Sequence, residues 1–238
     1  MDVCRTQKSV DRPVGSEEAG EYWRCTAIEP STRLRVGRGI AQTETEAAIA
    51  LWQQVKQRAA HRSHPPPVLS DGWGGHREAL VEVYGQVPQS RGRGRPPRRK
   101  QPVDGWHYTQ MVKQRDDKGS LTGVEVRVIY GDDTTVARTG TRTVYIERTN
   151  LTSRLMNGRL VRKTLGFSKR LAMLRAACSW EDAVYNLTRP VKTLRTDAAQ
   201  PDQRRWFHRS PAMAAGLTDH IWSIREMLMT IPVPTNRI

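Results

Sequence analysis

The segment VLSDGWGGHREALVEVY, residues 68–84, predicts a β-strand followed directly by an α-helix. Val68 and Leu69 come after a His/Pro-rich stretch and lead into Ser70 and Asp71, so we expect a short strand that ends at Asp71. Residues 76–84 have the apolar spacing of a short helix. This succession favours an α/β fold and places Asp71 at a strand end, where an aspartate is either a turn residue or a metal ligand.

Upstream of this segment, residues 21–40 predict a β-hairpin, with strands at Tyr22–Ile28 and Leu34–Ile40 around a turn at Glu29-Pro30-Ser31. A helix follows, because Thr43 and Glu46 have the spacing of a capping box. Its apolar face is formed by Ala48, Leu51, Trp52 and Val55.

Downstream, YTQMVKQ and VEVRVIYG alternate in polarity on either side of a turn-rich stretch, which predicts a second hairpin. From Tyr145 the spacing becomes helical, with an apolar face at Ile146, Leu151 and Leu155 that we expect to be buried. Helices are also expected around residues 167–178 and at the C-terminus. We therefore expect one α/β domain over residues 1–190, with a flexible basic insertion at 85–106, followed by a polar linker and helical tail at 191–238.

The charge of the chain is strongly basic, with 39 Lys and Arg against 24 Asp and Glu and a net charge of +15. Such a charge attracts polyanions, of which nucleic acid is the commonest. The segment RGRGRPPRRK, residues 91–100, has no apolar side chain and predicts an exposed basic loop. Three widely spaced cysteines favour neither a disulfide framework nor a zinc site. No membrane span or signal peptide is apparent, so we expect a cytoplasmic protein.

An aspartate at a strand end and an acid on a later helix are the elements of a two-metal nuclease site. Two Mg²⁺ ions about 3.5–4 Å apart need several hard oxygen ligands. Glu147 is the helix candidate, and Arg154 lies about 20° from it on the helical wheel and about 10 Å further along the axis. Asn150 lies in the same stripe. Taken alone, both acids are more often ordinary: Asp71 as a turn residue and Glu147 as part of a solvated helix face.

Longer motifs favour the interpretation of both acids as metal ligands. The run YIERTNLTSRLMNGRLVRKTLGFSK, residues 145–169, resembles the acid-bearing helix of bacterial DDE (Asp-Asp-Glu) transposases of the insertion-sequence-one kind. SDGWGGHREALVEVYG resembles the second-aspartate segment of that family. Further similar segments follow in the family's order: GEYWRCTAIEPSTRLRVGR, VIYGDDTTV, YNLTRPVKTLR and SPAMAAGLTDHIWSIREML.

The resemblance implies a ribonuclease-H-like fold, with a mixed sheet and flanking helices. Asp71 and Glu147 would be the second and third metal-binding carboxylates, and Arg154 would contact a DNA phosphate. Asp2 is the best match for the first carboxylate, with Asp11 as the alternative. Together they would hold two Mg²⁺ ions, for which Mn²⁺ can substitute.

Two departures from the family stand beside these matches. Relatives carry a DNA-binding region upstream of the first aspartate, so we expect this sequence to be N-terminally truncated. Where relatives have a histidine before K-T-L-R, this chain has Val191, and acids stand at Glu181 and Asp182.

The basic loop allows two interpretations. Arg93-Gly94-Arg95-Pro96 matches the core of an AT-hook, whose arginines enter a narrow minor groove. A nonspecific phosphate-binding loop explains the same charges, and would include Arg98, Arg99 and Lys100.

The resemblance thus implies a Mg²⁺-dependent DDE transposase that cleaves double-stranded DNA at element ends and transfers the strands to target DNA. It also implies a homo-oligomer on DNA, which we expect to be associated with the nucleoid. The alternatives are a catalytically inactive remnant that only binds DNA, and a basic RNA-binding protein.

Overall fold

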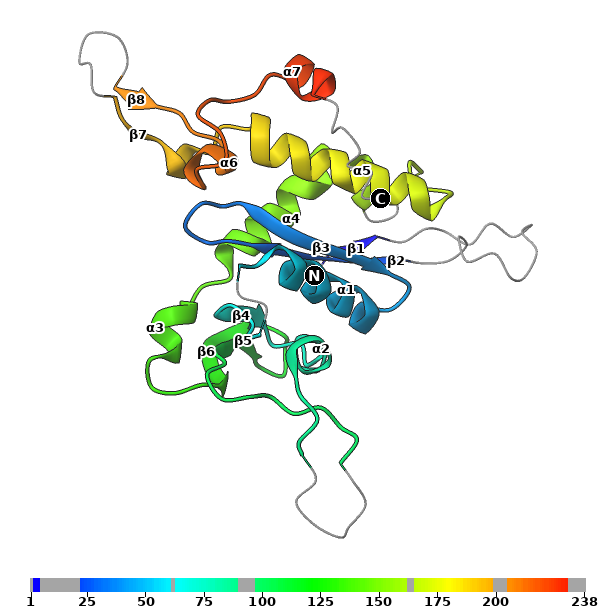
Figure 1. Ribbon diagram of the computed structural model, residues 1–238, viewed down its shortest axis with the longest axis vertical. Coiled ribbons are helices and arrows are strands. Elements are labelled where there is room, and N and C mark those ends of the chain that lie inside the picture. Colours follow the sequence, from blue (N-terminus) through cyan, green and yellow to red (C-terminus); the bar gives the residue numbers. More distant parts are fainter. Residues whose placement is uncertain are drawn as a thin grey trace. The chain divides into compact units, whose positions relative to one another are not determined.

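The computed structural model describes residues 2–4, 22–60, 63–89, 97–161, 165–198 and 205–230, with the backbone alone for residues 2–4 (Figure 1). The chain divides into two compact units. The first unit comprises Met1–Ala27 and Val36–Lys169, and the second comprises Ile28–Arg35 and Arg170–Ile238.

The first unit begins with a three-stranded sheet of order β1-β2-β3, formed by Asp2–Cys4, Tyr22–Ile28 and Arg35–Ala41. Helix α1, Glu44–Arg58, follows and lies along this sheet (Figure 1). Thr43 caps α1 by accepting a hydrogen bond from the backbone N–H of Glu46, as the sequence predicted. At Gly39, a Cβ atom would lie 1.8 Å from the Ala47 carbonyl oxygen, so this close helix packing requires glycine.

A second three-stranded sheet, of order β4-β5-β6, completes the first unit's strands. Its strands are Val68–Asp71, Tyr108–Arg115 and Leu121–Tyr130, and helix α2, Gly75–Tyr84, follows β4. Strands β4 and β5 are parallel, whereas β5 and β6 form an antiparallel hairpin. The predicted strand end at Asp71, helix over 76–84 and downstream hairpin are all confirmed.

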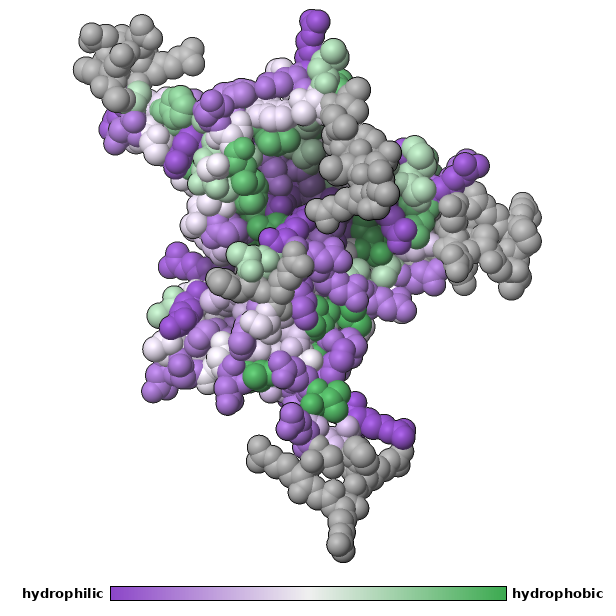
Figure 2. Space-filling model, in the orientation of Figure 1, coloured by the Kyte–Doolittle hydropathy of each residue, from purple (hydrophilic) through white to green (hydrophobic). Residues whose placement is uncertain are grey.

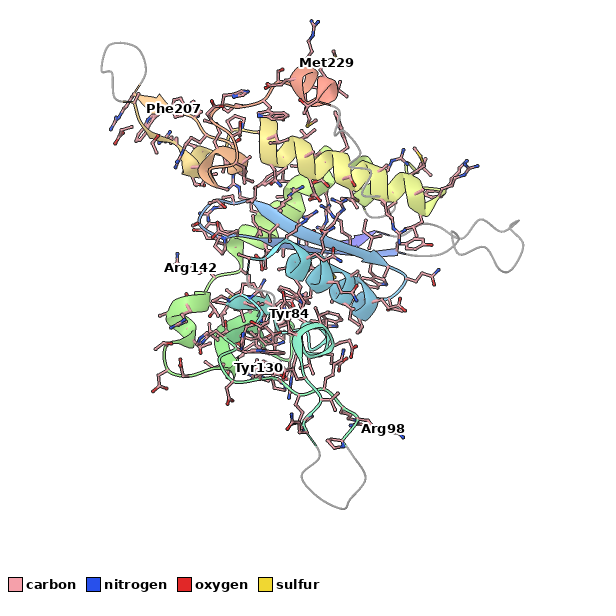
Figure 3. All side chains as sticks on the ribbon, viewed as in Figure 1. Tyr84, Arg98, Tyr130, Arg142, Phe207 and Met229 are labelled. Carbon is pink, nitrogen blue, oxygen red and sulfur yellow. The ribbon has the colours of Figure 1, made fainter. Side chains whose placement is uncertain are left out.

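The core of the first unit joins α1, α2 and the strands through buried side chains that include Leu51, Trp52, Leu80 and Tyr84. Aromatic contacts continue it toward the second sheet. Trp106 packs edge-on against Tyr84 and Tyr130, with ring centroids 6.4 and 5.6 Å apart. Figure 3 shows Tyr84 and Tyr130 in the region between α2 and the β4-β5-β6 sheet. Figure 2 shows hydrophilic residues mixed with residues of intermediate hydropathy on the visible surface around this sheet, and Leu121, Val124 and Val128 of β6 are exposed.

The first unit ends with α3 (Thr135–Thr139), α4 (Val144–Met156) and the short η1 (Gly158–Leu160). The helix expected around Glu147 is confirmed, but its expected buried face is wrong. Leu151 and Leu155 are 55% and 79% exposed. The buried side chains are those of Thr149, Thr152 and Ser153. Periodicity locates an apolar stripe but does not say which side of the helix meets the core.

The second unit contains α5 (Leu171–Ala183), continued by η2 (Val184–Thr188), a π-helical turn. The remaining elements are η3 (Lys192–Leu194), β7 (Thr196–Asp197), β8 (Trp206–Phe207), α6 (Pro211–Ala214) and α7 (Ile224–Met229). The stretch expected as a polar linker therefore includes a two-stranded ribbon, β7-β8 (Figure 1).

A buried ion cluster holds the second unit together. Arg35 forms ion pairs with Glu181 and Asp182, and its guanidinium lies 3.9 Å from the centre of the Tyr185 ring. The Asn186 side chain accepts from the backbone N–H of Arg35 and donates to its carbonyl oxygen. The two acids that depart from the family pattern thus form ion pairs with Arg35. These contacts attach the Ile28–Arg35 segment to α5 and η2.

The architecture is mixed α/β, with small sheets and helices, which confirms the α/β class at this level. In the part of the chain that the structure describes, no helix combines the length and hydrophobicity needed to cross a bilayer.

Candidate active site on β4, β5 and α4

Asp71 occupies the last position of β4, and its side chain is exposed. Its Oδ1 atom accepts a hydrogen bond of 3.2 Å from the backbone N–H of Trp73, which forms an Asx-turn after the strand. Oδ2 accepts no hydrogen bond from the described residues. Asp71 is therefore a turn residue that keeps one carboxylate oxygen available to a ligand.

A relay of hydrogen bonds fixes this turn from within the sheet. The Gln110 side-chain amide donates to Trp73 O at 3.0 Å and to Tyr108 Oη at 2.8 Å. Tyr108 Oη lies 2.9 Å from Ser70 Oγ, which donates to Asp71 O at 2.7 Å. Because Tyr108 has one hydroxyl hydrogen, it donates to Ser70 while it accepts from Gln110. The backbone on both sides of Gly72 is thereby held by buried side chains of β5.

Glu147 lies in the first turn of α4, with its side chain 53% exposed. Its Oε1 atom is 2.8 Å from Lys113 Nζ and accepts a hydrogen bond of 3.3 Å from Thr143 Oγ1. Oε2 has no hydrogen-bond partner among the described residues. Glu147 thus resembles Asp71 in that one oxygen is held by the protein and the other is available.

Strand β5 connects the two acids. Asp71 pairs with Met111 in the parallel register, so their side chains project from the same face of the sheet. Thr143 Oγ1, at the start of α4, is 3.9 Å from Met111 Sδ. Lys113 stands two residues beyond Met111, on the same face, and reaches Glu147. Asp71 therefore projects from the face of the β4-β5 pair on which Met111 and Lys113 contact the start of α4, the helix that carries Glu147.

The first expected ligand is only partly described. Asp2 lies in β1, where it pairs with Arg24 of β2, but its side chain is outside the described residues, as is Asp11. No group of three or more His, Cys, Asp or Glu side chains that could hold a metal occurs among the side chains that the structure describes. Asp2, a member of the expected group, lies outside those side chains.

His76 is the titratable neighbour of Asp71. It is largely buried in the first turn of α2 and packs edge-on against Trp73 and Trp52, with ring centroids 5.2 and 6.2 Å away. Burial lowers the pKa of His76 to about 4, while the negative charge of Asp71 opposes this shift. A neutral imidazole therefore lies beside the Asp71 carboxylate at neutral pH and leaves its charge uncompensated.

The expected DNA contacts of α4 lie along the helix from Glu147. Asn150 and Arg154 follow it by one and two turns, and both are partly exposed. Arg154 does interact with other parts of the chain. Glu147, Asn150 and Arg154 thus lie in one helix, α4, with the spacing expected from the helical wheel.

The basic loop is described only at its base. Arg93 and Arg95 lie outside the described residues, whereas Arg98 and Arg99 are exposed. Arg98 belongs to the segment that extends from α2 and away from the sheets (Figure 3). Gln86 and Gln101 close the loop with two backbone hydrogen bonds of 3.0 and 2.9 Å.

Lys100 differs from the two arginines in its contacts. Its Nζ atom is 2.6 Å from Glu82 Oε1 and also donates to the Glu82 carbonyl oxygen. The side chain therefore anchors the loop to α2, and its charge is partly compensated. Of the described loop cations, Arg98 and Arg99 are the better candidates for phosphate contacts.

Lys113 and Thr143 are site residues that the sequence did not single out. Lys113 is one of many basic residues in an ordinary strand pattern, so the sequence does not reveal that it faces Glu147. Thr143 lies just before α4, and its contact with Glu147 depends on where that helix begins.

Comparison of the chain with protein-family models, with curated proteins and with solved structures found no match. The candidate site therefore rests on the geometry of the chain's own residues.

Proposed function

We propose that the chain is the catalytic region of a DDE transposase, which cleaves DNA strands at element ends and transfers them to target DNA in a Mg²⁺-dependent reaction. We also propose that its fold is ribonuclease-H-like and that the protein acts as a homo-oligomer on double-stranded DNA. The observation that carries the proposal is that Met111 and Lys113, on the face of the β4-β5 pair from which Asp71 projects, contact Thr143 and Glu147 at the start of α4, which agrees with the family resemblance of both segments.

The donor atoms fit a hard divalent cation. Asp71 Oδ2 and Glu147 Oε2 are carboxylate oxygens without hydrogen bonds from described residues, and oxygen is the ligand that Mg²⁺ prefers. Asp71, Glu147 and Asp2 would hold the metal, which when bound supplies the charge that activates water and stabilises the phosphoryl transition state. The Ser70–Tyr108–Gln110 relay would keep the Asp71 turn rigid during this chemistry.

The basic groups around the acids would hold the DNA. Arg154 and Asn150 on α4 would contact phosphates next to the reacting bond, while Arg98 and Arg99 would bind the backbone further away. Lys113, on the same face as Asp71, would meet the phosphate once Glu147 binds metal. The net charge of +15 favours this partner over a neutral one.

One observation favours the alternative, a DNA-binding protein without catalysis. Lys113 neutralises the carboxylate that should bind metal. However, both side chains are about half exposed, and such pairs contribute at most about 1 kcal/mol. A divalent cation can displace a pair of this strength, so this contact does not prevent metal binding at Glu147.

The test is metal-dependent nicking of supercoiled plasmid by the full chain, with and without Mg²⁺ or Mn²⁺. We expect Asp71→Asn and Glu147→Gln to lower the nicking rate by at least about a hundredfold, because each removes a metal ligand. Matched controls are Asp133→Asn and Glu78→Gln, which change exposed acids of the same unit outside the candidate site. These controls should cut DNA at the wild-type rate.

Binding to duplex DNA is measured in parallel by fluorescence anisotropy. A wild-type chain that binds duplex DNA but does not nick it with either metal contradicts the enzymatic proposal and supports the inactive alternative. Equal losses in the site variants and in the control variants would show that Asp71 and Glu147 have no special role.

A further inference from the structure

The ribbon formed by β7 and β8 carries an unusual combination of cationic and aromatic side chains. Thr196 pairs with Phe207 and Asp197 pairs with Trp206. Side chains alternate between the two faces of such a ribbon, so Trp206 and Phe207 project from opposite faces. Phe207 is 50% exposed, and Figure 3 shows it on the ribbon in the second unit.

Two guanidinium groups lie over the Trp206 ring. Arg195 is 4.0 Å and Arg205 is 5.2 Å from the centre of its ring. Arginine stacked on an aromatic ring keeps its in-plane N–H donors available to a phosphate. Within residues 165–198 and 205–230, neither of these guanidinium groups makes an ion pair or donates a hydrogen bond. Stacking on Trp206 therefore holds both groups in place without using their charge.

Lys192, just before β7, is a third cation of this surface. It is exposed and has no ion-pair partner among the described residues. Arg209 provides a contrast in the same region, because it donates to Leu194 O at 2.7 Å and so stabilises the fold. Lys192, Arg195 and Arg205 thus have no ion-pair partner among the described residues, Asp197 shares the face of Trp206, and Phe207 exposes its ring on the opposite face.

We propose that the β7-β8 ribbon is a binding site for single-stranded DNA, in which a base stacks on Phe207 on one face and the strand passes around the edge of the ribbon, so that phosphates of neighbouring nucleotides contact Lys192, Arg195 and Arg205. Aromatic side chains beside cations are the common means of binding single strands, because every base has a face that can stack. Charge complementarity selects a polyanion, and the exposed flat ring selects an unpaired base. The choice of DNA over RNA rests on the proposed function, which exposes unpaired bases at cleaved ends.

The experiment measures binding of the full chain to a labelled oligothymidylate in the presence of a chelator. We expect Phe207→Leu to weaken binding by about tenfold, because leucine keeps an apolar side chain but cannot stack. Phe207→Tyr should keep the affinity within roughly twofold, since tyrosine retains the ring. Arg205→Ala should lower the slope of log affinity against log salt by about 0.7, the value for one phosphate contact on a single strand.

Arg225→Ala is the control, because it removes an equal charge from an exposed position of α7 in the same unit. The proposal is overturned if Phe207→Leu binds like the wild type, if Arg225→Ala lowers the salt slope as much as Arg205→Ala, or if oligouridylate binds more tightly than oligothymidylate. Because the assay contains no free metal, a chain that binds here but fails to nick plasmid would contradict the proposed function alone.

Discussion

Lys113 Nζ lies 2.8 Å from Glu147 Oε1 and joins β5 to the first turn of α4. The two side chains are 44% and 53% exposed, so water screens the interaction. The lysine thus guides the orientation of the glutamate while it competes only weakly with a cation. This relationship ties the strand that pairs with Asp71 to the helix that carries Glu147.

Replacing Lys113 by alanine should tighten divalent metal binding. The ammonium group and a cation compete for the same carboxylate, and an exposed pair of this kind corresponds to roughly a two- to fivefold change in Kd. Mn²⁺ titration followed by electron paramagnetic resonance measures the change, which should shrink as salt is added. Lys118→Ala, at the exposed turn between β5 and β6, is the control. Equal Mn²⁺ affinity in both variants would contradict a metal site at Glu147.

Removing the hydroxyl of Tyr108 should lower the unfolding free energy, whereas removing the hydroxyl of Tyr84 should not. Tyr108→Phe leaves Ser70 and Gln110 without their shared partner, which should cost about 1–3 kcal/mol of unfolding free energy. The Tyr84 hydroxyl is buried, burial raises its pKa to about 12, and no described group accepts or donates a hydrogen bond there. Tyr84→Phe should therefore be neutral or stabilising. Urea unfolding measures both, and equal destabilisation would contradict the relay.

Arg98 and Arg99 should contribute to the salt dependence of duplex binding. Each phosphate contact adds about 0.9 to the slope of log affinity against log salt, so alanine at both positions should lower the slope by about 1.8. Lys100→Ala should lower it less, because Lys100 already pairs with Glu82. An unchanged slope in the double variant would remove the described part of the basic loop from the DNA interface.

Much of the local structure and both candidate acids follow from sequence patterns, whereas the contacts that connect the acids to the sheet do not. The strand that ends at Asp71 and the capped helix after Thr43 are local features, because residues close together in the sequence determine them. The Lys113–Glu147 pair depends on strand register and on where α4 begins, neither of which periodicity determines. Leu151 and Leu155 show the same limit, since an apolar stripe on α4 turned out to be exposed. Tertiary packing decides these cases.

Arg35 should be essential to the stability of the second unit. Removing it takes away the guanidinium that pairs with the Glu181 and Asp182 carboxylates, and breaking a buried pair costs about 3–5 kcal/mol. Arg35→Ala should lower the unfolding free energy by this amount, and Arg35→Ala with Glu181→Gln should recover part of the loss. Arg225→Ala, at an exposed position, should change it by less than about 0.5 kcal/mol. Equal effects of Arg35→Ala and Arg225→Ala would contradict the cluster's role.

His76 should make stability fall as pH decreases from 6.5 toward 4. Burial lowers its pKa to about 4 in the folded chain, whereas the unfolded chain has a value near 6.5, so between these values the unfolded state binds more protons. The folded state should therefore lose roughly 2 kcal/mol between about pH 7.5 and about pH 5 through this group. Urea unfolding at the two pH values measures the loss, and His76→Phe, which keeps an aromatic ring between Trp73 and Trp52, should remove it.

His220 provides the opposite sign and hence the control. Hydrogen bonds to Asp219 and Glu226 raise the pKa of His220, so its contribution is fully present below pH 6.5 and is lost as pH rises through the higher folded value. His220→Gln should therefore leave the loss of stability at low pH intact, or make it slightly larger. If His76→Phe retains the wild-type pH dependence while His220→Gln abolishes it, a neutral, buried imidazole beside Asp71 is excluded.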